Sequence, residues 1–174
     1  MRFYYGNSIF IFGCLKLPGA LWKTNSLMVC SMDHLLKSHI FLRQFAPNKY
    51  RALKQACLKL IEAGMVGPGY FHGMCRRELL SSTYLDNGIA VPHGVPGSRS
   101  EINNSGMIIM QFPEGVDWGD NNRAFLLCAL AANGKEHLKM LSHLACSLDD
   151  TELCRKLAVT EQVDQIYQSI TRFC

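Results

Sequence analysis

The sequence predicts an α/β domain in which helices pack on a β-sheet, and three observations support this fold class. The chain has 174 residues, which is enough for one hydrophobic core but short for two domains. Apolar residues make up 48% of it and charged residues 18%, as in a globular protein rather than a disordered or coiled-coil chain. Short apolar runs alternate with segments of helical periodicity, which is the pattern of layered α/β folds.

The first elements of this pattern are a strand and a helix. Residues 39–42 (HIFL) form a short apolar run that is typical of a strand. Apolar residues then recur every three or four positions, which predicts an amphipathic helix. We expect Asn48 to cap its start and Gly64 to end it, because these residue types favour the two ends of helices. The stripe that should face the sheet consists of Leu53, Ala56, Cys57, Leu60 and Ile61.

The middle of the chain continues with a second helix and two strands. Residues 68–80 begin with proline, which is common in the first turn of helices, and predict a helix. Residues 89–91 and 107–112 are apolar and predict buried strands. The segment between these strands, residues 92–106, is rich in Gly, Ser, Asn and Pro and predicts a loop, and residues 113–122 (PEGVDWGDNN) predict a turn region.

The last part of the chain is mainly helical. Residues 123–132 (RAFLLCALAA) are apolar almost throughout and fit either a central strand or a buried helix, between which periodicity does not decide. A helix should begin near Gly134, a short one after residues 149–151, and a final one over residues 163–170. The apolar positions of the first of these helices are Leu138, Leu141, Ala145 and Leu148.

The charge pattern argues against a nucleic-acid partner. Lysine and arginine number 18 against 14 for aspartate and glutamate, and they stand singly or in pairs such as Arg76-Arg77. No run of five or more basic residues occurs. We therefore expect no nucleic acid among the partners.

The eight cysteines do not point to a metal site. None forms a CxxC pair, cysteine and histidine do not combine at zinc-finger spacing, and HExxH is absent. Cys57, Cys128 and Cys146 fall on apolar faces of predicted elements. We therefore expect reduced thiols in a cytoplasmic protein, with neither a metal nor a cofactor.

Residues 1–33 differ from the rest of the chain. Their apolar stretch, residues 8–15, is too short to span a bilayer, so we expect no direct membrane insertion. A signal peptide is an alternative, but no small-residue cleavage site follows cleanly. We expect an N-terminal extension that arises from start-codon choice, with Met28 or Met32 as other starts, and one domain over residues 34–174.

A histidine follows the predicted strand in the sequence GIAVPHG, residues 88–94. Functional groups of open α/β sheets gather beyond strand ends, where a rigid element holds a side chain that reaches solvent. Pro92 restricts the backbone before His93, and Gly94 removes a side chain after it. An anion would then approach the ring and nearby backbone amides. A lone histidine at a loop edge is also common without any function, so this position leaves both interpretations open.

Two further residues suit an anionic ligand. His137 lies in the first turn of the helix near Gly134, where the helix dipole attracts anions and disfavours imidazolium. The alternative is a histidine that only caps the helix. Arg77 offers a planar, permanently charged set of donors that matches phosphate oxygens. The alternative is an arginine on a solvated helix face, paired with Glu78 or Glu101.

The stretch RRELLSSTYLDNGIAVPHG, residues 76–94, closely resembles the active-site signature of a known family. This family is the enzyme IIA domains of the bacterial sugar phosphotransferase system, in its mannitol and fructose branch. QFPEGVDWGD and ALAANGKEHLKMLSHLACSLDD resemble the mannitol-type members downstream, and HIFL and LIEAGMVGPGYFHGM resemble the family's beginning. The resemblance covers about residues 38–170. Departures from the family's usual residues occur at Gly67, Gly69, Gly73, Asn121 and Asn122.

The resemblance implies a single domain with a mixed β-sheet flanked by helices on both faces. It places the phosphorylated histidine at His93, the second active-site histidine at His137 and the active-site arginine at Arg77. The implied function is a phosphotransferase that takes a phosphoryl group from the phosphocarrier protein HPr and passes it to a cysteine of a IIB domain. That domain serves the membrane IIC domain, for uptake of mannitol or a related sugar. A neutral imidazole, which is nucleophilic near pH 7, suits this role.

Two other functions stay open from the sequence. Nitrogen-type IIA modules share the Asn-Gly-Ile-Ala and Pro-His-Gly pattern but act by phosphorylation-dependent binding to other proteins. The FPEGVDW segment and the histidine of KEHL favour the sugar branch over this regulatory one. The other alternative is a catalytically silent interaction domain in which His93 is structural.

Overall fold

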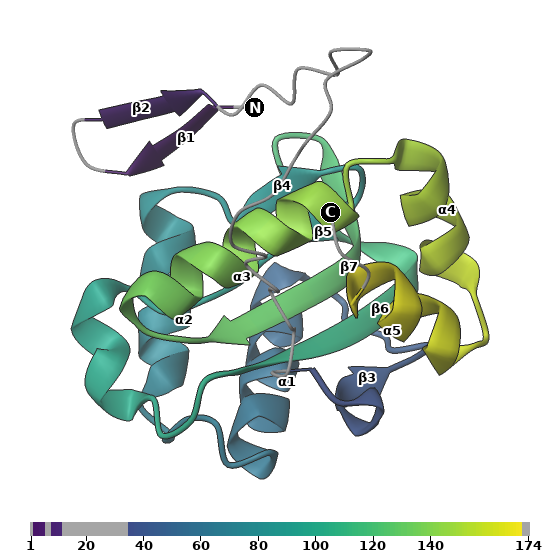
Figure 1. Cartoon of the computed structure of the whole chain (residues 1–174). Coiled ribbons are helices and arrows are strands. Elements are labelled where there is room, and N and C mark those ends of the chain that lie inside the picture. Colours follow the sequence, from purple (N-terminus) through teal and green to yellow (C-terminus); the bar gives the residue numbers. More distant parts are fainter. Residues whose placement is uncertain (1, 6–7, 12–34, 172–174) are drawn as a thin grey trace, which may run out of the picture.

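A five-stranded mixed sheet lies between two layers of helices in the computed structural model of the chain (Figure 1). The structure describes residues 2–5, 8–11 and 35–171. The strands of the sheet are β3 (Ile40–Phe41), β4 (Tyr84–Asp86), β5 (Ile89–Ala90), β6 (Gly106–Gly119) and β7 (Asn122–Ala131). They lie in the order β3-β6-β7-β5-β4. This arrangement confirms the predicted fold class.

The N-terminal segment contributes a separate pair of antiparallel strands, β1 (Arg2–Tyr5) and β2 (Ser8–Ile11). Residues 12–15 of the apolar stretch, and the alternative starts Met28 and Met32, lie outside the described residues. The division of the chain into an extension and a domain stays a prediction.

The apolar run that fits either a strand or a helix is the central strand β7. It pairs antiparallel with β6 and parallel with β5, so both of its edges are hydrogen-bonded. The outer strands are β3, which pairs parallel with β6, and β4, which pairs antiparallel with β5. A strand that is covered on both faces takes apolar residues at successive positions, which explains why the sequence shows no alternation there.

The helices divide between the two faces of the sheet (Figure 1). One face is covered by α1 (Lys49–Glu62) and α2 (Tyr70–Leu80), and the other by α3 (Gly134–Ser147), α4 (Thr151–Val159) and α5 (Val163–Thr171). Successive strand residues point to opposite faces. Ile108 and Met110 therefore pack with the α1 and α2 side chains, and Met107 and Ile109 with those of the other layer. Two short 3-10 helices, η1 (Lys37–His39) and η2 (Pro96–Glu101), complete the domain.

Several predicted helix ends are confirmed. The Asn48 side chain accepts a hydrogen bond of 3.0 Å from the backbone amide of Arg51 and caps α1. Gly64 has a φ of 69°, the left-handed conformation that glycine adopts most easily after a helix. The Asp150 side chain caps α4 in the same way as Asn48 caps α1. The second helix begins two residues later than its proline, at Tyr70.

Most of the expected turn over residues 113–122 is instead the second half of β6. Val116 and Trp118 are buried and their neighbours are more exposed, which is the alternation of a strand with one covered face. The turn itself is confined to Asp120 and Asn121, whose φ values of 53° and 61° are typical of a two-residue hairpin. The prediction was wrong because the proline and glycines of this stretch obscured its two-residue period.

The helix α3 forms as predicted, and its predicted stripe is confirmed in part, because Leu148 is buried and Leu141 packs against the core. Met140, His143 and Leu144 are buried, whereas Leu138 is 54% exposed. His143, which the sequence leaves as structural or surface, is structural, because its Nε2 donates a hydrogen bond to the Ile170 carbonyl of α5.

The cysteines follow the prediction only in part. Cys57 and Cys128 are buried free thiols, as expected from their apolar positions. Cys146 is exposed and disulfide-bonded, so the prediction of a reduced core thiol is wrong for this residue. It follows the buried Leu144 by two positions, which directs it to the opposite side of α3.

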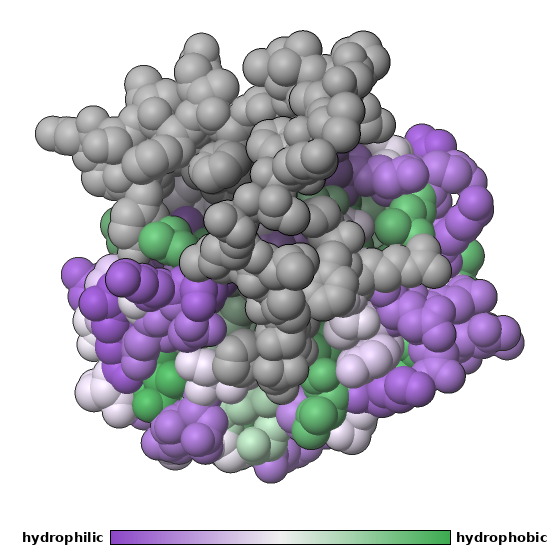
Figure 2. Space-filling view, in the orientation of Figure 1, coloured by the Kyte–Doolittle hydropathy of each residue, from purple (hydrophilic) through white to green (hydrophobic). Residues whose placement is uncertain are grey.

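The surface is mixed in polarity. On the face shown in Figure 2, hydrophilic side chains separate the apolar surface into small areas. Leu79 and Leu80, at the end of α2, are 88% and 71% exposed. Within the described residues, no helix combines the length and the hydropathy needed to cross a bilayer.

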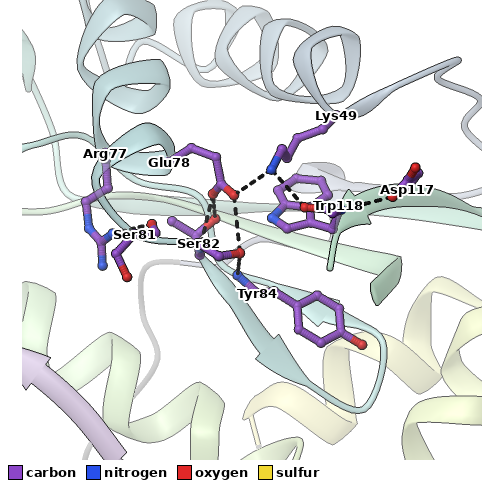
Figure 3. Close-up of polar contacts among 10 residues, drawn as sticks. Lys49, Arg77, Glu78, Ser81, Ser82, Tyr84, Asp117 and Trp118 are labelled. Carbon is purple, nitrogen blue, oxygen red and sulfur yellow. Dashed lines mark hydrogen bonds and ion pairs between the residues drawn. The ribbon is translucent and has the colours of Figure 1, made fainter. Parts of the chain in front are cut away.

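A buried carboxylate ties the end of α2 to the segment that follows it (Figure 3). Glu78 is 8% exposed and accepts hydrogen bonds from the backbone amide of Thr83 at 2.9 Å and from its hydroxyl at 2.5 Å. Lys49 of α1 forms an ion pair with the same carboxylate at 3.1 Å and donates to the Trp118 carbonyl at 2.8 Å. The Lys49 side chain of α1 therefore connects both helices of this layer to the sheet, because it bonds to Glu78 of α2 and to the Trp118 carbonyl of β6.

The contact continues toward the strand that precedes His93. The carbonyl of Thr83 accepts a hydrogen bond of 2.9 Å from the amide of Val91, two residues before His93. Glu78 thus fixes the segment to which this strand is bonded.

Replacing Glu78 with alanine should lower the free energy of unfolding by about 3 kcal/mol. The change removes the ion-pair partner of the partly buried Lys49 and leaves the buried Thr83 amide without its acceptor. Urea unfolding at pH 7 measures this loss. The control Glu62→Ala removes an ion pair with Lys59 in which the glutamate side chain is 61% exposed, and it should cost less than about 1 kcal/mol. Equal losses in the two variants would contradict the role of Glu78.

Candidate active site

The structure brings together all three residues that the sequence predicts for the site. Arg77 Nε donates a hydrogen bond of 3.1 Å to His93 Nε2. The rings of His93 and His137 meet edge to face, with their centroids 4.6 Å apart and their planes at 60°. Arg77 comes from the last turn of α2, His93 follows β5, and His137 lies in the first turn of α3. Three elements from distant parts of the chain therefore meet at one point.

His93 is held by the edge of the sheet beyond the end of β5. The β5 and β7 register pairs Ile89 with Leu126 and Ala90 with Leu127. An isolated parallel bridge between His93 and Leu130 continues the same register. The amide of Leu130 donates to the Pro92 carbonyl at 2.9 Å. The backbone of His93 is thus an extension of the sheet.

The hydrogen bonds of the ring define its tautomer. His93 Nδ1 lies 2.8 Å from the Val91 carbonyl oxygen, which can only accept, so Nδ1 carries the proton. Nε2 then carries the lone pair, and this assignment agrees with the hydrogen bond that it accepts from Arg77. The nucleophilic nitrogen of the site is therefore Nε2.

His93 is more buried than the sequence predicts. Only 6% of its surface is exposed, because the rings and backbone around the strand end enclose it, whereas we expected a side chain that reaches solvent. Burial, with the neighbouring His137 and Arg77, lowers the pKa of His93 to about 3, although the hydrogen bond to the Val91 carbonyl acts in the opposite direction. The ring is therefore neutral at pH 7.

The second histidine is also held in its neutral form. Burial lowers the pKa of His137, and the positive charges of Arg77 and Arg99 lower it further. Arg99 lies on η2, in the segment after His93, and no motif in the sequence marks it as part of the site. The fixed positive charge at the site thus comes from arginine, and both imidazoles are neutral at pH 7.

The alternative pairings of Arg77 do not form. Its Nη1 donates to the Ser81 carbonyl at 2.7 Å, at the end of its own helix. Glu78 pairs with Lys49, and Glu101 accepts a hydrogen bond of 2.9 Å from the amide of Gly69. Arg77 is half-buried rather than on a solvated face.

The glycines that depart from the family's usual residues make room for neighbouring side chains. A Cβ at Gly69 would lie 2.6 Å from the Glu101 Cδ, and one at Gly73 would lie 2.3 Å from the Ser98 Oγ. These contacts join α2 to η2, which follows His93. The glycines therefore serve close packing beside the site.

The expectation that backbone amides next to His93 receive an anion is wrong for Gly94. Its amide donates a hydrogen bond of 2.9 Å to the Tyr70 hydroxyl. A Cβ at this position would lie 2.3 Å from the Ser98 Oγ and 2.7 Å from the Tyr70 Cε2. The glycine is thus required by the approach of Tyr70 and Ser98. Nothing in the sequence marks Tyr70 as part of the site, because a tyrosine among apolar residues is typical of a core.

The arrangement suits covalent transfer of an anionic group. A neutral imidazole with a defined lone pair is a good nucleophile near pH 7. A guanidinium beside that lone pair stabilises negative charge on a group that the nitrogen attacks. Phosphoryl transfer requires this kind of positioning and charge stabilisation rather than proton transfer.

Comparison with known proteins agrees with this chemistry. The family described as "Phosphoenolpyruvate-dependent sugar phosphotransferase system, EIIA 2" matches residues 33–173. The chain is 38% identical over 143 residues to the mannitol-specific phosphotransferase enzyme IIA component of Geobacillus stearothermophilus, covering 80% of this chain and 99% of that one. It is 41% identical over 127 residues to a multiphosphoryl transfer protein of Haemophilus influenzae, covering 73% of this chain and 26% of that protein. It thus spans about a quarter of the length of that longer relative.

Solved structures show the same fold. The crystal structure of mannitol IIA from Escherichia coli matches with a TM-score of 0.74 and 35% identity, over 78% of this chain and 98% of that one. The IIA chain in a complex of mannitol enzymes IIA and phosphorylated IIB from E. coli also has a TM-score of 0.74, at 34% identity over 78% and 96% of the two chains. The fold, the clustered residues and the match over most of the chain agree, and this chain belongs to the EIIA 2 family of the phosphoenolpyruvate-dependent sugar phosphotransferase system.

Proposed function

We propose that this protein is a phosphocarrier of a sugar phosphotransferase system. It accepts a phosphoryl group from phospho-HPr on His93 and passes it to a cysteine of a IIB domain, for uptake of mannitol or a related sugar. The observation that supports this proposal most strongly is the neutral ring of His93, whose Nε2 lone pair lies beside Arg77 at 3.1 Å. We assign the activity to residues 34–174, since the family match begins at residue 33. These partners imply a cytoplasmic location.

The first step forms a bond between His93 Nε2 and phosphorus. The Nε2 lone pair attacks the phosphorus of the HPr phosphohistidine, the P–N bond of HPr breaks, and its electron pair returns to the HPr ring. No proton needs to leave His93, because Nδ1 keeps its own. The hydrogen bond from Nδ1 to the Val91 carbonyl stabilises the positive charge that the phosphorylated ring develops.

The second step returns the ring to its starting state. A thiolate of the IIB domain attacks the phosphorus, and the electron pair of the P–N bond goes back to Nε2. Arg77 stabilises the charge spread over the phosphoryl oxygens in both steps, because its guanidinium already lies next to Nε2. His137, at the start of α3 and in ring contact with His93, limits the space around the phosphoryl group and contributes a helix N-terminus to the site.

The sugar branch is favoured over the regulatory alternative by two observations. The relatives of similar length at 38% and 35% identity carry mannitol-specific names, whereas the nitrogen regulatory protein IIA of Neisseria meningitidis is 26% identical. The FPEGVDW segment, which resembles the mannitol-type members, forms the outer half of β6, in which Phe112, Val116 and Trp118 are buried. Transfer from His93 to a mannitol-type IIB cysteine would support transport, and its absence beside phosphorylation-dependent binding to other proteins would support regulation.

Incubation with phosphoenolpyruvate, enzyme I and HPr should add one acid-labile phosphate to the protein, and His93→Ala should abolish it. A phosphohistidine is acid-labile, and the variant lacks the attacking nitrogen. The measurement compares the labelled phosphate that stays on the protein in a gel after neutral treatment with the label that stays after acid treatment. The control His72→Ala changes an exposed histidine of α2 and should label fully. Full labelling of His93→Ala would remove His93 from its role.

Replacing Arg77 with alanine should lower the rate of phosphoryl acceptance by about a hundredfold while the fold stays intact. The lost guanidinium interacts chiefly with charge that develops during transfer. Labelling reactions that are quenched at successive times measure the rate, and circular dichroism checks the fold. Arg76→Ala, which changes the exposed neighbour, is the control and should transfer at the rate of the unchanged protein. An unaffected rate in Arg77→Ala would show that its placement in the mechanism is wrong.

The neutral state of His93 should appear in the pH dependence of stability. The folded protein holds the pKa of His93 at about 3, whereas an unfolded chain has the ordinary histidine value of 6.5. Between these values only the unfolded chain binds the proton, so folded stability falls as the pH drops below 6.5. The stability of the unchanged protein relative to His93→Ala should fall by about 0.7 kcal/mol from pH 7 to 6 and should approach the limiting slope of about 1.4 kcal/mol per pH unit below pH 6.

Urea unfolding of both proteins at pH 7, 6 and 5 measures this difference. Carboxylates and the other histidines contribute similarly to both, so their titrations largely cancel. A difference that does not change with pH would contradict a neutral, buried His93.

A further inference from the structure

We propose that Tyr70 is a positioning residue for phosphoryl transfer, and that its hydroxyl sets the orientation of His93 from within the sheet. The inference rests on the proposed function and adds a residue to its site. Tyr70 is the first residue of α2, and its hydroxyl contacts the backbone of Gly94, directly after His93, and of Leu130 on the neighbouring strand β7.

The Tyr70 hydroxyl occupies a place in the hydrogen-bond ladder between the β5 extension and β7. In a parallel bridge between His93 and Leu130, the Leu130 amide bonds to the Pro92 carbonyl, and the Leu130 carbonyl bonds to the Gly94 amide. The first bond is present at 2.9 Å. In the second, the Tyr70 hydroxyl lies between the two groups: it accepts from the Gly94 amide at 2.9 Å and donates to the Leu130 carbonyl at 2.7 Å.

The hydroxyl keeps this place because the whole side chain is fixed. Tyr70 is 2% exposed, and burial raises its pKa to about 12, so the hydroxyl keeps the proton that it donates. Its ring packs so closely on Gly94 that a Cβ there would lie 2.7 Å from Tyr70 Cε2. Ser98 packs on the same glycine and donates to the Val95 carbonyl at 2.7 Å, which holds the following segment against the ring.

Insertion of the hydroxyl separates the chain from β7 directly after His93. Two hydrogen bonds in series span a greater distance than one, so the Gly94 amide stands farther from Leu130 than in a continuous ladder. We infer that the hydroxyl displaces the peptide between His93 and Gly94 from β7 while the bridge between His93 and Leu130 is kept, and that this displacement aims the His93 ring at Arg77.

The same helix supplies the guanidinium that the ring faces. Tyr70 and Arg77 are seven residues apart on α2, which is close to two turns and places both on one side of the helix. At one end of this side Tyr70 binds the Gly94 amide, directly after His93. At the other end Arg77 contacts His93 Nε2. A change at Tyr70 should therefore alter the distance between His93 and Arg77 without touching either one.

The variant Tyr70→Phe removes only the hydroxyl and keeps the ring that packs on Gly94. The Gly94 amide would then bond directly to the Leu130 carbonyl and draw the peptide after His93 toward β7. Tyr84→Phe is the matched control, because the Tyr84 hydroxyl accepts a 3.0 Å hydrogen bond from the Gly88 amide at the opposite end of β5. Both variants lose one hydroxyl that binds a glycine amide beside this strand.

The experiment measures kcat and KM for phosphoryl acceptance from phospho-HPr in the three proteins, with urea unfolding as the stability readout. We expect Tyr70→Phe to lower kcat by about tenfold, since small displacements of reacting groups slow transfer strongly, with KM unchanged within about twofold. Tyr84→Phe should keep the original kcat. Nitrogen NMR of His93 should show the Nδ1-protonated form in all three proteins, because the Val91 carbonyl is unchanged, and a shifted Nε2 resonance only in Tyr70→Phe, where the hydrogen bond from Arg77 is altered.

Several results would overturn the inference. If Tyr70→Phe keeps the kcat of an active unsubstituted protein, the inference about Tyr70 is wrong and the proposed function still stands. Equal slowing in both tyrosine variants would assign the effect to general stability. A change confined to KM would assign Tyr70 to docking of the donor. Failure of the unchanged protein to accept a phosphoryl group would overturn the proposed function and this inference with it.

Discussion

The hydrogen bond between His93 Nδ1 and the Val91 carbonyl determines the chemistry of the site, because it decides which nitrogen carries the lone pair. A ring with the opposite tautomer would direct an N–H at Arg77, and two donors would then face each other. The backbone of the strand therefore assigns the nucleophile. No second side chain is needed to fix the tautomer, because the accepting carbonyl belongs to Val91, two residues before His93.

The site keeps its nucleophile neutral through burial and positive neighbours. A carboxylate beside the ring would stabilise the imidazolium form and remove the lone pair at neutral pH. Among the described residues the buried carboxylate is Glu78, and it is bonded to Lys49 and Thr83. Arg77 supplies a positive charge that does not vary with pH. Attraction of an anion and availability of the lone pair are therefore provided by different groups.

The helix α2 links these functions to the fold. Its side chains Tyr70, Arg77 and Glu78 contact, respectively, the backbone after His93, the ring of His93, and the segment bonded to the strand before it. The central strand β7 also holds the chain at the site, through the hydrogen bond from the Leu130 amide to the Pro92 carbonyl. Displacement of this helix would change the charge at the site and the orientation of the nucleophile together.

Local features of the fold could be predicted because they depend on neighbours in the sequence. Asn48 and Asp150 cap helices through atoms two or three residues away, and the strand before His93 is a short apolar run closed by proline. The length of β6 was not predictable in the same way. Its outer half contains proline and glycines, and pairing with β7 holds it extended despite them.

The sequence by itself determined which residue types could perform the chemistry, and the motif around His93 pointed to Arg77 and His137 as its neighbours. Only the tertiary structure decided the tautomer, the burial of the ring and the place of Tyr70. The partners in these contacts are backbone atoms of Val91, Gly94 and Leu130, which every residue type carries. A sequence pattern records side chains, so it cannot show which carbonyl or amide a folded chain brings to a histidine or a tyrosine.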